Sequence, residues 1–141
     1  MSLSGKDELE ILRLIGRYAQ TGSRQEADNW IDLFTEGGVW ERKKGSSQGK
    51  YTEQVRVEGK AALREFALAS FAVQGGTVYQ YVAANPVVSG EGERARGHST
   101  AFIFGIDAKG ASVILIGNFE DEYHKTSEGW KFAYRGMTVS T

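Results

Sequence analysis

Few side chains in this chain can transfer protons or bind metals, and they are scattered along it. The sequence has 2 histidines and 0 cysteines, which excludes a thiol nucleophile, a disulfide and a thiolate zinc site. His98 belongs to a stretch that alternates like a β-strand, and His124 stands beside Lys125. Neither histidine has another at metal-ligand spacing. We therefore predict no metal site, and neither histidine stands out as a general base.

Two carboxylates are candidate general bases. Glu41 follows Trp40 in a short segment with strand character, and Asp121 lies in an acidic run. Arg135 falls on the predicted neighbouring strand, so an ion pair is the simpler interpretation of Asp121. Glu41 is the better candidate base, provided that it faces a cavity.

The length and composition of the chain restrict the classes of molecule that it can bind. A chain of 141 residues with 40% hydrophobic and 25% charged side chains has the composition of one globular domain. Its net charge of −1 argues against nucleic acid as the main partner. The apolar run at 111–116 is too short to span a bilayer, and residues 1–10 lack the apolar core of a signal peptide. We predict a single cytoplasmic domain over 1–141 that binds neither membrane nor nucleic acid.

A basic cluster interrupts this balanced charge. Its members are Arg42, Lys43, Lys44 and Lys50, within a stretch rich in Gly and Ser. We interpret the cluster as a solvated hairpin loop, and an anion-binding site is the alternative.

Three helices must position these groups. Ser4 and the apolar stripe behind it predict a capped amphipathic helix that ends near Gln20. Ser23 stands at capping distance from Glu26, which predicts a second helix ending at the glycines 37–38. A third helix is predicted over 61–73.

The rest of the chain alternates with the period of β-strands. The predicted strands are 39–42, 51–57, 77–88, 94–105, 112–124 and 130–139. Short polar loops with glycine join the last four, which indicates an antiparallel meander. Gly97, Gly117 and Gly136 are candidate bulges or bends in these long strands. The predicted fold is α+β, with a cone-shaped, curved antiparallel sheet of about six strands around three helices.

The strand at 94–105 has two different faces. Small residues fall on one face, namely Ala95, Gly97, Ser99 and Ala101, and larger ones on the other, including His98, Thr100, Phe102 and Phe104. The small face leaves room for a ligand, or else receives aromatic side chains from the helices. The bulky outer face suits contact with a second copy, so we predict a homodimer.

Five segments in this order resemble the SnoaL-like group of the nuclear transport factor 2-like superfamily, which includes polyketide cyclases and is related to scytalone dehydratase. They are residues 15–34, 38–41 (GVWE), 85–88 (NPVV), 117–123 (GNFEDEY) and 129–135 (GWKFAYR). The resemblance covers nearly the whole chain. It implies a cystatin-like α+β barrel around a small-molecule pocket, and a lyase, isomerase or cyclase acting on an apolar ring or polyketide-like substrate.

The resemblance also implies where an acid–base pair would stand. The family commonly has an aspartate after the first helix and a histidine four residues before the Asn-Pro-Val-Val segment. This chain has Ser23 and Tyr81 at these positions, and neither is a competent base unaided. Tyr81 can still donate a hydrogen bond to a substrate oxygen and is the candidate catalytic residue. The alternatives are a non-catalytic binder of an apolar ligand and an assembly subunit like the small subunit of aromatic-ring dioxygenases.

We therefore predict a pocket for a small apolar molecule, without a cofactor. Aromatic rings would supply contact area, and a few polar groups would orient the ligand. Tyr79 and Tyr81 are two residues apart on a strand, so both should face inward. The predicted lining is Tyr18, Trp30, Trp40, Tyr79, Tyr81, Asn85, Ser99 and Phe119.

Overall fold

The computed structural model describes residues 2–44 and 53–140. Their helices and strands are α1 (Gly5–Ser23), α2 (Ala27–Ile31), β1 (Phe34–Arg42), β2 (Val55–Glu58), α3 (Lys60–Ala72), β3 (Val78–Glu91), β4 (Arg94–Asp107), β5 (Gly110–Thr126) and β6 (Gly129–Val139). Within the described part of the chain, none of the helices has the length and apolar character needed to cross a membrane.

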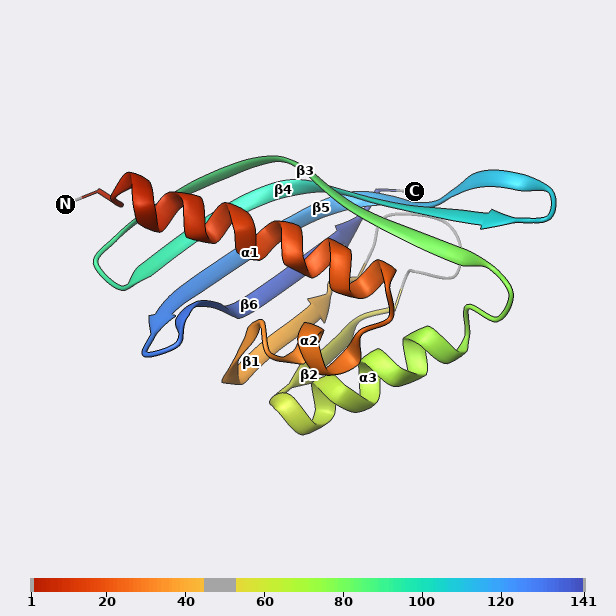
Figure 1. Ribbon diagram of the computed structural model, residues 1–141, viewed down its shortest axis with the longest axis horizontal. Coiled ribbons are helices and arrows are strands. Elements are labelled where there is room, and N and C mark those ends of the chain that lie inside the picture. Colours follow the sequence, from red (N-terminus) through yellow and green to blue (C-terminus); the bar gives the residue numbers. More distant parts are fainter. Residues whose placement is uncertain (1, 45–52, 141) are drawn as a thin grey trace.

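All six strands belong to one sheet, in the order β2-β1-β6-β5-β4-β3. Figure 1 shows α1 along one face of the curved sheet, with α2 and α3 grouped beside β1 and β2. The predicted α+β class, with three helices and a six-stranded sheet, is confirmed. Two details are corrected: β1 runs parallel to β6, so the sheet is mixed, and β2 and β3 are its two edges, so it does not close into a barrel.

α1 begins as predicted and ends later. Ser4 Oγ accepts a hydrogen bond from the Asp7 amide at 3.1 Å, which satisfies one of the unpaired donors of the first turn. The helix runs on to Ser23, so Ser23 does not cap α2, and the predicted second cap is wrong. α2 has five residues, and its first turn has no side-chain cap.

The apolar stripe of α1 faces the interior and includes the one aromatic residue of this helix, Tyr18. Ile11, Leu14, Ile15 and Tyr18 follow the i, i+3, i+4, i+7 spacing and are all buried. At the other end of the helix, Asp7 and Glu10 hold the β5–β6 hairpin, because both accept hydrogen bonds from Trp130, at 3.0 and 2.6 Å.

The meander is confirmed, because β3, β4, β5 and β6 pair antiparallel in sequence order. Of the two roles predicted for Gly97, Gly117 and Gly136, the bulge is wrong, since the pairing stays in register at all three. One register shift lies in β3 at Asn85 and Pro86, between Ala84 and Val87. Proline has no N–H to donate, which interrupts the ladder there.

The β1–β2 pair is also present and antiparallel, and Arg42 pairs with Val55 at the end where the chain passes from one strand to the other. Arg42 is the last residue of β1, which confirms the predicted end of the strand at 39–42 and separates this residue from the rest of the basic cluster. Of the predicted loop and second strand, Lys50 and residues 51–52 lie outside the described residues.

Candidate functional site

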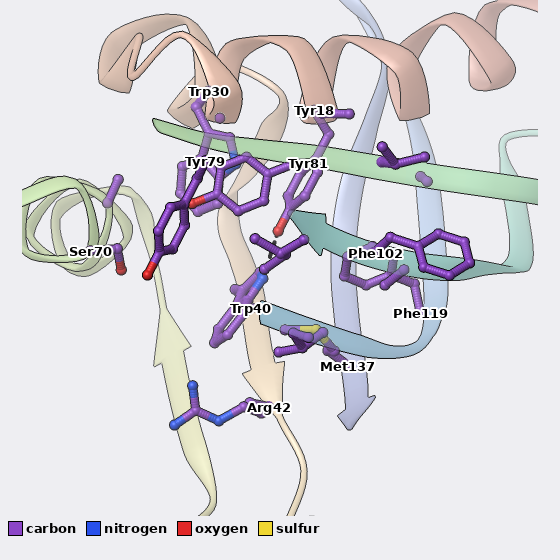
Figure 2. Close-up of a pocket in the computed structure, with 18 of the residues that line it drawn as sticks. Tyr18, Trp30, Trp40, Arg42, Ser70, Tyr79, Tyr81, Phe102, Phe119 and Met137 are labelled. Carbon is purple, nitrogen blue, oxygen red and sulfur yellow. Dashed lines mark hydrogen bonds between the residues drawn. The ribbon is translucent and has the colours of Figure 1, made fainter. Parts of the chain in front are cut away.

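A cavity of about 420 Å³ lies between α1, α3 and the sheet. Figure 2 shows aromatic side chains converging on it from α1, α2, β1 and β3, namely Tyr18, Trp30, Trp40, Tyr79 and Tyr81. Of the predicted lining residues, those that border the cavity are Tyr18, Trp30, Trp40, Tyr79, Tyr81 and Phe119. A cavity of this size lies within the range that small-molecule sites occupy in proteins.

Asn85 and Ser99 do not line the cavity, which corrects two predictions. Asn85 sits in the β3 bulge with φ 54° and is exposed. Ser99 does face inward and is buried, but it lies farther along β4 than the cavity extends. The alternation of side chains along a strand predicts which face of the sheet a residue occupies, but it does not predict how far along the strand a cavity extends.

Sequence reasoning missed part of the lining. Helix α3 contributes Phe66, Ser70 and Phe71, whose i, i+4, i+5 spacing places them on one face of the helix. Arg42 was missed because it belongs to the basic cluster, although it shares a strand face with Trp40. Phe102, predicted on the outer face, also borders the cavity.

The cavity wall is aromatic, with few polar atoms. The rings of Trp40 and Phe66 lie 4.5 Å apart between centroids, and Tyr18 lies 5.7 Å from both Trp30 and Phe119. The polar side chains at the wall are Tyr18, Arg42, Ser70, Tyr79 and Tyr81. None of the described lining residues is an aspartate, a glutamate or a histidine.

Tyr18 is oriented by a buried hydrogen bond. Trp40 Nε1 lies 2.8 Å from Tyr18 Oη, and the two side chains meet in Figure 2. An indole N–H can only donate, so the phenol oxygen accepts, and its own proton is directed to another acceptor. Burial raises the pKa of Tyr18 above its ordinary value, although the Arg135 guanidinium and the Trp40 N–H act in the opposite direction. The phenol is therefore a neutral donor at physiological pH.

Behind this wall lies a buried ion pair, as the sequence predicts. Arg135 Nε is 3.1 Å from Asp121 Oδ1, and both side chains are fully buried. The N–H does not point straight at the oxygen, so this contact is an ion pair and not an aligned hydrogen bond. The guanidinium carbon also lies 3.6 Å from the centroid of Phe119 and 4.1 Å from that of Tyr18. Burial raises the pKa of Asp121, and Arg135 opposes that shift.

Tyr81 and Ser23 do lie together, but not as an acid–base pair. Ser23 Oγ accepts a hydrogen bond from the Tyr81 amide at 2.9 Å, so the serine serves the backbone of β3. The Tyr81 hydroxyl accepts from Gln74 Nε2 at 3.0 Å, and Gln74 Oε1 accepts from Gln25 at 3.0 Å. This chain of amides places the Tyr81 ring at the cavity wall.

The other candidate acids and bases lie away from the cavity. Glu41 lies on the opposite face of β1 and accepts hydrogen bonds from Tyr134 at 2.7 Å and Gln54 at 2.9 Å. These hydrogen bonds lower the pKa of Glu41. His98 borders an outer groove, and His124 lies 3.1 Å from Arg94. The described residues contain no group of three or more side chains that could hold a metal ion.

Comparison with protein families gives one match. The model of a family described as a SnoaL-like domain matches residues 4–136. No curated protein matches the sequence.

Solved structures share the fold. A protein of unknown function from Mycobacterium tuberculosis has a TM-score of 0.84 at 24% identity, over 97% of this chain and 78% of that one. A candidate aromatic ring hydroxylase from Novosphingobium aromaticivorans has a TM-score of 0.79 at 26% identity, over 99% and 92%. The β subunit of a candidate aromatic-ring-hydroxylating dioxygenase from the same species has a TM-score of 0.77 at 14% identity, over 94% and 88%.

Proposed function

This chain belongs to the SnoaL-like domain family, and we propose that it binds an apolar ring compound through a ketone or hydroxyl oxygen. The rings of Trp40, Phe66 and Phe119 supply the apolar contact. Tyr18 donates a hydrogen bond to the ligand oxygen and thereby sets its orientation.

The hydrogen bond from Trp40 to Tyr18 carries this proposal. Because the Tyr18 oxygen accepts from Trp40, the phenol proton needs an acceptor elsewhere, and none is found for it among the described residues. A buried donor without a partner costs about 1–3 kcal/mol. A ligand oxygen in the cavity would remove that cost.

A similar protein and the shape of the cavity wall also support an aromatic ligand. The similar protein from Novosphingobium aromaticivorans, at 26% identity, is named a candidate aromatic ring hydroxylase. Stacking on the indole and phenyl rings of the wall also favours planar rings over flexible chains, because fewer rotatable bonds are immobilised on binding.

A lyase, isomerase or cyclase reaction is the second candidate function. Tyr18 and Tyr81 both bring a phenol to the cavity, and a neutral phenol can polarise a carbonyl without losing its proton. The described lining supplies no carboxylate or imidazole base, so the proton acceptor would be water or the substrate itself.

Resemblance to a dioxygenase β subunit, at 14% identity, supports only a shared fold. We also propose a homodimer formed through the outer face of the sheet.

Two probes of nearly equal shape test the binding function. 2-Acetylnaphthalene carries a ketone oxygen, and 2-isopropenylnaphthalene replaces it by a methylene group. We expect the purified protein to prefer the ketone, measured by calorimetry or by quenching of tryptophan fluorescence. Tyr18→Phe should weaken ketone binding roughly five- to tenfold, the size expected for one hydrogen bond. The hydrocarbon should bind this variant at least as well as the unmodified protein.

Tyr134→Phe is the matched control, because it removes a phenol oxygen from the outer face, where it donates to Glu41. It should leave both affinities unchanged. Absence of binding by either probe would rule out the proposed ligand class, and equal binding of both would rule out the role of Tyr18. Recovery of the ketone chemically unchanged supports a binder, and a product derived from it supports the second candidate.

A further inference from the structure

Tyr81 forms part of the cavity wall, and its ring packs against a glycine of helix α1. Gly22 lies near the end of that helix and also borders the cavity. A Cβ atom at Gly22 would stand 3.0 and 3.2 Å from two carbons of the Tyr81 ring, closer than packed side chains usually come. Figure 2 shows the ring beside α1. The absence of a side chain at Gly22 therefore allows the ring to lie where it does.

Hydrogen bonds fix both ends of Tyr81. Its backbone amide donates to Ser23 Oγ at 2.9 Å, and its hydroxyl accepts from Gln74 Nε2 at 3.0 Å. Gln74 is buried and accepts in turn from Gln25 at 3.0 Å. The ring cannot turn aside without breaking one of these bonds, so Tyr81 is a rigid part of the wall.

Aromatic side chains from distant strands bound the same open space. Trp40 on β1 packs against Phe66, with ring centroids 4.5 Å apart, and both border the cavity. Three strands separate β1 from β3 in the sheet. On β3, Tyr79 packs edge-on against Tyr81 with centroids 6.4 Å apart. The place of the tyrosine rings therefore determines how much of this space is left for a ligand.

From these contacts we infer that Tyr81 is a specificity-determining residue, whose ring limits the size of the ring compound that the cavity accepts. This inference rests on the proposed function, since it concerns the same cavity and the same class of ligand. A larger ligand would have to displace the ring, which costs a hydrogen bond or forces an overlap with the helix at Gly22. The cavity therefore selects compounds by size and does not adapt to each.

Two ketones that differ by one fused ring test the inference. 2-Acetylnaphthalene is the smaller, 2-acetylphenanthrene is the larger, and both present a ketone oxygen to Tyr18. The quantity measured is the ratio of their dissociation constants, in which a general change in affinity cancels. Tyr81→Val removes the ring and keeps a residue suited to a strand. It should shift the ratio at least about tenfold in favour of the larger ketone.

Tyr81→Phe separates the ring from the hydroxyl. Both variants lose the hydrogen bond with Gln74, but only Tyr81→Val loses the ring. Tyr81→Phe should leave the ratio nearly unchanged, because Ser23 still fixes the backbone and Gly22 still lies against the ring.

A methyl group at Gly22 tests the same wall from the helix. Gly22→Ala should press the Tyr81 ring toward the cavity and shift the ratio roughly fivefold in favour of the smaller ketone. The effect should disappear in the double variant with Tyr81→Val, which has no ring to displace. Gly16→Ala is the matched control, because its methyl group stands on the exposed side of α1 and meets nothing within 4 Å beyond its neighbours in the helix. It should leave the ratio unchanged.

Other results would contradict one statement or the other. A ratio that Tyr81→Val does not change overturns the inference, and binding of 2-acetylnaphthalene then leaves the proposed function standing. A Gly22→Ala effect that persists in the double variant shows that the methyl group itself fills the cavity, which also overturns the inference. If circular dichroism shows that Tyr81→Val is unfolded, Tyr81→Leu takes its place in both tests. If neither ketone binds the unmodified protein, the proposed function fails and the inference fails with it.

Discussion

The charge of Arg135 is wholly buried, and it is stabilised in two ways. Asp121 supplies the counter-charge at 3.1 Å, and the rings of Tyr18 and Phe119 lie against the guanidinium. Either partner left alone would be an uncompensated charge in the interior, which costs several kcal/mol. The two residues therefore have to be kept or replaced together.

Removing one member of the pair should cost more stability than replacing both. Asp121→Ala is expected to lower the free energy of unfolding by about 3–5 kcal/mol, because it strands the Arg135 cation. The double variant Asp121→Leu with Arg135→Met should lose much less, since apolar side chains of similar size need no counter-charge. Urea denaturation followed by circular dichroism measures both values.

The exposed pair Lys43 and Glu120 provides the control for this experiment. Its side chains are 41% and 66% exposed, so Glu120→Gln should change the free energy of unfolding by less than about 1 kcal/mol. A double variant at Asp121 and Arg135 as unstable as Asp121→Ala would contradict the electrostatic explanation and indicate a packing role.

The sequence predicts the roles of some side chains and not those of others. The partnership of Asp121 and Arg135 is visible in advance, because opposite charges on neighbouring strands find each other. The role of Ser23 is not visible. A serine three residues before a glutamate matches a helix cap, but its oxygen accepts from the amide of Tyr81, 58 positions away. Such long-range partners depend on how β3 lies against the end of α1.

Helices and strands were predicted more successfully than their arrangement. The strands β3 to β6 follow from alternation and from glycine-bearing turns, which are local signals. The parallel pairing of β1 with β6 joins segments far apart in the chain, and alternation is the same in parallel and antiparallel strands. The cavity was predicted in part for a similar reason, because the aromatic positions are evident while the extent of the open space is set by how α1 and α3 cover the sheet.

Glu41 links three strands of this sheet and should make their association depend on pH. It accepts hydrogen bonds from Tyr134 on β6 and from Gln54 before β2, and Arg56 on β2 lies 3.6 Å away. These contacts lower the pKa of Glu41 in the folded state. A carboxyl with a lower pKa in the folded than in the unfolded chain stabilises the fold above its unfolded pKa, and this stabilisation is lost as the pH falls.

Glu41→Gln should therefore be destabilising at neutral pH by about 1–2 kcal/mol and progressively less so below about pH 4. Urea denaturation of both proteins between pH 7 and pH 3 measures the difference. Glu58→Gln is the control, because the carboxylate of Glu58 is exposed and pairs with the exposed Arg56. A Glu41→Gln deficit that stays constant over this pH range would show that its contacts do not depend on ionisation.

For the molecule as a whole, the outer face of the sheet is the surface through which we propose that a second copy binds. Phe102 and Phe104 stack there with centroids 6.0 Å apart, and exposed apolar side chains include Val82 and Val113, at 38% and 54%. Polar side chains on this face form two rows, with Arg96 and His98 along β4 opposite Glu122 and Glu120 along β5. A second copy related by a two-fold axis can place its acidic row against the basic row, which makes the face self-complementary.

Assembly through this face predicts a dimer that a charge at its centre weakens. Sedimentation at micromolar concentration should give the mass of two chains for the unmodified protein. Phe104→Glu should shift the equilibrium toward the monomer by at least about tenfold in the dissociation constant, because a carboxylate would have to be buried against the same residue of the partner. Phe104 is preferred to Phe102, which also borders the cavity. Leu68→Glu on α3 introduces the same charge at a residue that is 47% exposed, away from the sheet face, and should leave the dimer intact. A monomeric unmodified protein would exclude the dimer, and an equal effect of Leu68→Glu would place the interface elsewhere on the molecule.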